Sequence, residues 1–74
     1  MSEMRTNECL IRLGKPIKTR RIEQGLSQEK LGLMIGSGQS YIYRVESGRM
    51  SYGIDKLVRI ADALDVEVKE LIDF

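Results

Sequence analysis

The sequence predicts an all-α fold, a compact bundle of about five short helices. Apolar residues recur at helical spacing in successive segments, and no segment alternates with the two-residue period of a β-strand. Glycines separate the segments. With 74 residues the chain is one domain at most, and 42% hydrophobic residues are enough for it to collapse around a core.

The first predicted helix carries an apolar stripe and ends near Gly25, which suits the left-handed position after a helix. Pro16 lies inside the stripe and leaves two alternatives open. Either the helix starts near Leu13 with Pro16 in its first turn, or an earlier turn capped by Asn7 joins it through a kink. We divide the chain into an N-terminal extension over 1–12 and a domain over 13–74. The stripe consists of Leu10, Leu13, Gly14, Ile17 and Arg21.

Two short helices follow, with a tight turn between them. Ser27 is a good N-cap for the second helix, which points Leu31 and Ile35 inward and stops at Gly36. A three-residue turn over 36–38 leads into a third helix over 39–47. Helix, short glycine turn and helix together make a helix-turn-helix arrangement.

The fourth predicted helix has the clearest amphipathic pattern of the chain. One or two further turns over 68–72 close the chain as the fifth helix. The core stripe predicted for the fourth helix consists of Ile54, Leu57, Val58, Ala61 and Leu64.

The composition excludes most catalytic and metal chemistry. The chain has no His, one Cys and no Trp, so neither a Cys/His zinc site, nor a histidine-based catalytic dyad or triad, nor a disulfide framework can be built. We therefore expect no enzyme, no catalytic or metal-binding residue, no cofactor and no small-molecule ligand. No apolar run is long enough to span a membrane, and the first residues are too charged for a signal peptide, so we expect a cytoplasmic protein without a membrane partner.

The net charge of +1 hides a polarised distribution. Residues 1–49 hold nine basic and five acidic residues, whereas residues 50–74 hold three basic and six acidic ones. This asymmetry indicates one face for an anionic partner and another for a different contact.

The third helix presents a polar face. At about 100° per residue, the side chains of Gln39, Ser40, Tyr43, Arg44 and Ser47 fall within roughly 140° of one another, whereas the apolar pair Ile42 and Val45 lies on the other side and anchors the helix to the core. Arg and Gln can pair with guanine and adenine edges, and Tyr or Ser can contact phosphate or a thymine methyl. An ordinary solvated helix carries the same residue types, so this helix alone does not decide between the two interpretations.

The order of residues across several helices resembles the Cro and phage-repressor type of helix-turn-helix regulators. The motifs are Gly25-Leu26-Ser27-Gln28, then Glu46-Ser47-Gly48, then Ile60-Ala61-Asp62-Ala63-Leu64, within a resemblance from about Leu13 to Ile72. The resemblance implies a five-helix, lambda-repressor-like domain that binds a pseudo-palindromic double-stranded DNA operator as a homodimer, with the third helix in the major groove. The short chain is similar to restriction-modification controller proteins or free-standing Cro-like regulators, and we favour the controller type.

The resemblance also implies roles for single residues. Arg21 and Glu46 match a structural ion pair between the first and third helices. The positions that match base contacts are Gln39, Ser40, Tyr43 and Arg44. The positions implied to contact phosphates are Ser27, Gln28, Tyr41, Ser47, Arg49 and Lys18.

Several positions depart from the family pattern. Ser37 and Gly38 replace an apolar residue and a capping Ser or Thr, which predicts weak capping of the third helix. Gly32 takes the usual Ala position, Tyr52 stands where Pro is frequent, and Glu67 stands where a Ser or Thr cap is frequent.

Leu33 and Met34 are apolar at positions that are usually polar in the family. We expect them to be partly buried against residues 1–10. If they were exposed, they would form a patch suited to a protein partner such as RNA polymerase or an anti-repressor.

The C-terminal residues are the predicted dimer interface, over 64–74. Two of them must close the monomer core, and Phe74 follows a fold that has already ended, so it folds back or meets a second copy. A protein-interaction module on the same scaffold, such as an antitoxin or a repressor antagonist, stays open as the alternative function. The interface candidates are Leu64, Val66, Val68, Leu71, Ile72 and Phe74.

Overall fold

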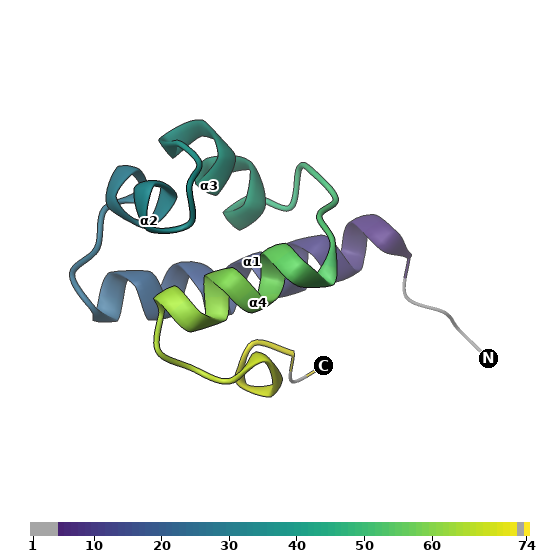
Figure 1. Cartoon of the computed structure of the whole chain (residues 1–74). Coiled ribbons are helices and arrows are strands. Elements are labelled where there is room, and N and C mark those ends of the chain that lie inside the picture. The colour runs from purple at the N-terminus through teal and green to yellow at the C-terminus, as the bar shows by residue number, and fades with distance from the viewer. Residues whose placement is uncertain (1–4, 73) are drawn as a thin grey trace.

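The computed structural model describes residues 5–72 and 74, and within them the chain is helical without a strand (Figure 1). The elements are α1 (Thr6–Glu23), α2 (Gln28–Met34), α3 (Gln39–Glu46), α4 (Ile54–Ala63) and the 3₁₀ turn η1 (Val68–Glu70). The all-α class is confirmed. The predicted fifth helix is only one 3₁₀ turn, so the described residues form four α-helices instead of five. None of these helices is long and apolar enough to cross a membrane.

The first helix begins earlier than either alternative placed it. α1 runs continuously from Thr6 to Glu23 with Pro16 inside it, and Arg5 is its N-cap residue, so Asn7 lies within the helix. Pro16 lacks the N–H group that would bond one turn back, which costs a single intrahelical hydrogen bond. Gly14 and Ile17, on either side of Pro16, remain buried and hold the helix against the core. Residues 1–4 of the expected extension lie outside the described residues.

All four α-helices end in the same hydrogen-bonding motif. The residue after each C-cap has a positive φ, and two backbone N–H groups bond back to carbonyls of the last turn, as Gly25 and Leu26 do to Ile22 and Arg21 in α1. This is the Schellman motif, which favours glycine because its left-handed residue has no Cβ to clash. The left-handed residues are Gly25, Gly36, Gly48 and, after α4, Asp65 with φ 57°.

The helix starts are capped unequally. The hydroxyl oxygen of Ser27 accepts the backbone N–H of Lys30 at 2.9 Å, which confirms Ser27 as the N-cap of α2. Gly38 precedes α3 and offers no side-chain acceptor, which confirms the weak capping of that helix. Glu67 replaces the missing Ser or Thr by forming a capping box with Glu70 at η1.

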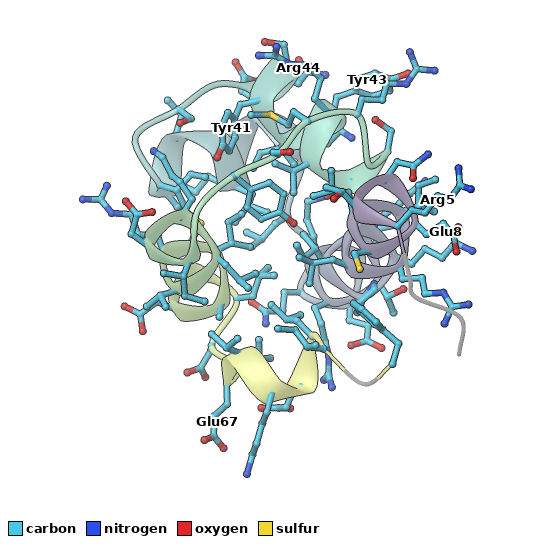
Figure 2. The ribbon with its side chains drawn as sticks, turned by 90° about the vertical axis from the view of Figure 1, so that its right-hand side faces the viewer. Arg5, Glu8, Tyr41, Tyr43, Arg44 and Glu67 are labelled. Atoms are coloured by element: carbon cyan, nitrogen blue, oxygen red, sulfur yellow. The ribbon has the colours of Figure 1, made fainter. Side chains whose placement is uncertain are left out.

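The four α-helices and η1 surround one core. Figure 2, turned by 90° from Figure 1, shows α4 and α1 on opposite sides, α2 and α3 above them and η1 below. The side chains of the core come from all five elements or the residues next to them. The buried apolar residues are Ile17, Leu31, Ile35, Ile42, Val45, Leu57, Ile60, Ala61, Leu64 and Leu71.

The core stripe of α4 differs from the predicted one. Ile54 and Val58 are 68% and 49% exposed, and Ile60 is buried in their place. The prediction followed apolar residue type along the helix, but Ile54 and Val58 lie on a flank that is turned away from the centre of the core. Two β-branched apolar side chains are thus left on the surface of α4.

Leu33 and Met34 are not buried, contrary to the prediction. They are 67% and 47% exposed. The physical reason is their place in the fold, because α2 and the N-terminal end of α1 lie at opposite ends of the molecule in Figure 1. Residues 5–10 therefore cannot cover the exposed side of α2.

Two glycines bring helices into backbone contact. A Cβ on Gly14 would lie 2.4 Å from the carbonyl oxygen of Glu46, so α1 passes directly across the end of α3. A Cβ on Gly32 would lie 2.6 Å from the carbonyl carbon and oxygen of Gly38, so α2 touches the start of α3. The close packing of α2 on the start of α3 thus depends on the absence of a Cβ at position 32.

Candidate nucleic-acid interface

The outer face of α3 is polar and exposed. Ile42, Val45 and Glu46 are buried, which fixes the rotation of the helix and turns the opposite side outward. The four predicted base-reading side chains are exposed, and Figure 2 shows Tyr43 and Arg44 pointing away from the body of the molecule. They are Gln39, Ser40, Tyr43 and Arg44.

A buried carboxylate connects three helices beneath this face. Arg21 donates from Nε to Oε2 of Glu46 at 2.5 Å and from its Nη2 to Oε1 at 3.1 Å. The remaining terminal nitrogen of Arg21 donates to the carbonyl oxygen of Leu26 at 2.7 Å. The Glu46 side chain is 3% exposed and the Arg21 side chain 10% exposed, so water barely screens the pair. The structure thus contains the ion pair that the resemblance implied.

Gln28 joins the same carboxylate. Its Nε2 donates to Oε1 of Glu46 at 3.1 Å, and Gln28 is the first residue of α2. One of the two N–H bonds of its amide group is thereby used, and the other remains for an acceptor outside the protein. No sequence pattern predicts this contact, since the two residues are eighteen positions apart and belong to different helices.

A small open cavity lies between α1, α2 and α3. Its volume is about 110 Å³, and Lys18, Gln28, Tyr43, Glu46 and Ser47 line it. An ammonium group and an amide N–H are both suitable donors for a phosphate oxygen. The structure thus brings together Lys18, Gln28 and Ser47, three of the predicted phosphate contacts, beside the exposed face of α3.

The hydroxyl groups of the other candidates are partly engaged within the protein. Ser47 Oγ donates to the carbonyl oxygen of Tyr43 at 2.7 Å, so its proton is used inside α3. Ser27 is an acceptor in its capping bond, which leaves its own O–H free to donate.

The two remaining phosphate candidates are Tyr41, within α3, and Arg49, after its end. Arg49 follows α3, and its guanidinium carbon lies 5.9 Å from the centre of the Tyr43 ring, a cation–π distance. Tyr41 is half-buried against the core, and the Lys56 ammonium lies 5.5 Å from its ring centre. Burial, and secondarily the negative charge of Asp55, raises the pKa of Tyr41, so its hydroxyl stays protonated and able to donate at neutral pH.

Comparison with known proteins is consistent with this geometry. The sequence model of the helix-turn-helix family matches residues 17–71. The chain belongs to this helix-turn-helix family. The matched range starts inside α1 and extends through the two-helix motif, α4 and η1 to Leu71.

Among the relatives of this helix-turn-helix protein are two controllers. It is 31% identical over 70 residues to control protein C.BamHI of Bacillus amyloliquefaciens, which covers 93% of this chain and 86% of that protein. The crystal structure of the restriction-modification controller protein C.AhdI from Aeromonas hydrophila superposes with a TM-score of 0.81 at 35% identity, covering 85% of this chain and 96% of that one. An HTH-type transcriptional regulator of Sinorhizobium medicae is 34% identical over 67 residues, and there the matched part is 90% of this chain but only 48% of the longer relative.

Proposed function

We propose that this helix-turn-helix protein is a sequence-specific, double-stranded DNA-binding transcriptional regulator of the restriction-modification controller type. The main support is the exposed polar face of α3, held in place by the buried carboxylate of Glu46. Gln39, Ser40, Tyr43 and Arg44 read base edges in the major groove. The similarity to two controller proteins over most of their length favours this type over other small regulators.

Phosphate contacts set the register of α3 on DNA. Donors for phosphate lie around the edge of the α3 face, on Lys18, Gln28, Ser27 and Arg49, and Tyr41 adds a hydroxyl group. The Ser47 hydroxyl joins them by exchanging its bond to the Tyr43 carbonyl oxygen for one to phosphate. Contacts to phosphate position a protein on the duplex but carry no sequence information, whereas contacts to base edges select the site.

Selection of bound fragments from random DNA, followed by affinity measurements against salt concentration, tests this function. We expect enrichment of a short palindromic site and a linear fall of log affinity with log salt, whose slope counts the neutralised phosphates. Gln39→Ala or Arg44→Ala costs about 1–3 kcal/mol on the selected site and relaxes the preference there. Arg59→Ala removes the same charge from the exposed side of α4 and is the matched control. Equal losses on every sequence would assign Gln39 and Arg44 to phosphates instead of bases.

We also propose that the protein acts as a two-fold homodimer through α4 and the C-terminal residues. Leu64 and Leu71 are fully buried in the monomer core, so the contact is made by Val66, Val68, Ile72 and Phe74, of which Ile72 and Phe74 are 41% and 44% exposed. The exposed pair Ile54 and Val58 adds apolar surface on α4, beneath which the C-terminal segment returns in Figure 1. A dimer of this kind reads half-sites about one helical turn apart, with centres ~34 Å from each other.

Sedimentation equilibrium tests the dimer. We expect a dimer at micromolar concentration and a monomer after Phe74→Asp combined with Ile54→Asp, because two charges would then be buried in an apolar contact. Leu33→Asp, on the exposed side of α2, is the control and leaves the mass unchanged. A wild-type monomer at high micromolar concentration contradicts the proposal.

The exposed pair Leu33 and Met34 favours a second candidate function, a protein-interaction module. Salt dependence separates the two candidates, since only DNA binding shows a slope close to the number of neutralised phosphates. Changing both residues to Glu leaves DNA affinity unchanged if α3 reads DNA, and removes partner binding if this patch is the functional surface.

A further inference from the structure

One flank of α1 faces the end of α3, and two backbone contacts define which flank it is. Gly14 lies against the carbonyl oxygens of Val45 and Glu46. Three residues earlier, the backbone of Ile11 lies close to Gly48, because a Cβ on Gly48 would lie 2.7 Å from the Ile11 Cα. The first half of α1 therefore runs past the C-terminal end of the proposed recognition helix.

Lys15 lies on this flank. At about 100° per residue, with Gly14 at zero, Lys18 falls near 40°, Ile11 near 60° and Lys15 near 100°, while Arg12 falls near 160° and points further away. Along the axis, Lys15 lies about 6 Å from Ile11 and about 4.5 Å from Lys18, at 1.5 Å per residue. Along the helix axis, Lys15 therefore lies between Lys18, which lines the cavity with Gln28, and Ile11, which touches the turn that leads to Arg49.

The charge of Lys15 has no use within the described part of the fold. Its side chain is exposed, and no described carboxylate lies within ion-pair distance of it. Arg20, Arg21 and Lys69, in contrast, each have an acidic partner. Figure 2 shows the labelled Glu67 at the far end of the molecule from Arg44, so the acidic C-terminal part lies away from the α3 face.

We propose that Lys15 is a further DNA-backbone contact, which extends the phosphate-binding row from Gln28 and Lys18 along α1 toward Arg49. This inference rests on the proposed DNA-binding function and adds a residue that lies before the range matched by the family, 17–71. The ligand is the phosphate backbone beside the half-site that α3 reads, so Lys15 adds affinity and no sequence preference.

Measurement of DNA affinity against salt for Lys15→Ala tests the proposal. One lost phosphate contact reduces the slope of log affinity against log salt by about 0.9 and weakens binding about three- to tenfold at physiological salt, equally on the selected site and on unrelated DNA. Lys15→Arg keeps the charge and should bind as the wild type does. Lys69→Ala, on the far side at η1, removes the same charge and should change the slope little.

Each outcome decides one point. If the wild type binds DNA selectively and with salt dependence, but Lys15→Ala has the same slope of log affinity against log salt, the role of Lys15 is overturned. The proposed function then still stands. Equal effects of Lys15→Ala and Lys69→Ala show only a general charge effect and also overturn it. A wild type without selective DNA binding overturns the proposed function itself. Circular dichroism of each variant establishes that the fold is retained.

Discussion

The amide nitrogen of Gln28 donates a hydrogen bond to Oε1 of Glu46 at 3.1 Å, and the same oxygen accepts Nη2 of Arg21 at 3.1 Å. One carboxylate, on the last residue of α3, thereby holds the first residue of α2 and the last turn of α1. A buried carboxylate is stable only if its lone pairs are satisfied by charge or by hydrogen bonds. The proposed phosphate contact and the proposed base-reading helix are therefore fixed to each other by one group.

Removal of one partner of this network should be costly. Glu46→Ala leaves the Arg21 charge buried and unpaired, and we expect a loss of about 3–5 kcal/mol in the free energy of unfolding. Gln28→Ala removes only a neutral donor and should cost about 1 kcal/mol. Urea unfolding followed by circular dichroism measures both. Similar, small costs for the two variants would show that the carboxylate is not the centre of the network.

Gly32 and Gly38 should respond in opposite directions to alanine. Gly32→Ala places a Cβ 2.6 Å from the Gly38 carbonyl group, and because that obstacle is backbone, overpacking should cost about 1–3 kcal/mol despite the better helix propensity of alanine. Gly38→Ala meets no atom within 4 Å and has a φ of −125°, which any residue adopts. We therefore expect Gly38→Ala to be neutral or slightly stabilising. Thermal unfolding of the two variants compares them, and a stable Gly32→Ala would show that α2 and α3 can separate freely.

Asp65 occupies a position where glycine is preferred. With a φ of 57°, Asp65 is the left-handed residue of the Schellman motif after α4. Glycine occupies this position after the other three α-helices. Asp65→Gly should stabilise the protein by about 0.5–1 kcal/mol through relief of this conformation. Asp62→Gly, at an exposed position inside α4, is the control and should lower the free energy of unfolding by about 1 kcal/mol. Destabilisation by Asp65→Gly would indicate a role for the carboxylate that offsets the strain.

The sequence allowed the helices to be predicted because their ends have local causes. Ser27, Gly25, Gly36 and Gly48 act within a few residues of the helix that each one starts or stops, so their effect can be derived from order alone. The start of α1 was harder to place, because it depends on how residues 6–12 pack beside α3, at Ile11 and Gly48.

Exposure and long-range contacts could not be derived in the same way. Periodicity identifies apolar residues on a helix, but whether Ile54, Val58, Leu33 and Met34 are covered depends on where neighbouring elements end. The ion pair between Arg21 and Glu46 was inferred through resemblance, whereas the bond from Gln28 was not predicted at all, since it exists only when three helices meet. The face of α3 was predictable because its inward residues are apolar or paired.

Tyr52 should make the stability of the protein depend on alkaline pH. Its hydroxyl group is buried without a hydrogen-bond partner among the described residues, and burial, with a smaller effect of Tyr41, raises its pKa to about 12 from the ordinary value of 10. Between these two values the unfolded chain has lost the phenolic proton while the folded protein retains it. The unfolded state then binds fewer protons, so the free energy of unfolding falls as pH rises from 10 toward 12. Tyr52→Phe removes this titration.

Urea unfolding at neutral pH and between about pH 10 and about pH 12 measures this effect. At neutral pH, Tyr52→Phe should be neutral or stabilising by about 1 kcal/mol, because it removes a buried hydroxyl without a partner. At alkaline pH the wild type should lose more stability than Tyr52→Phe, while Tyr43→Phe, altered at an exposed ring, should follow the wild type. The rest of the chain is the same in all three proteins, so the difference between variants isolates Tyr52. Equal slopes for the wild type and Tyr52→Phe would mean that the hydroxyl of Tyr52 reaches solvent in the folded protein.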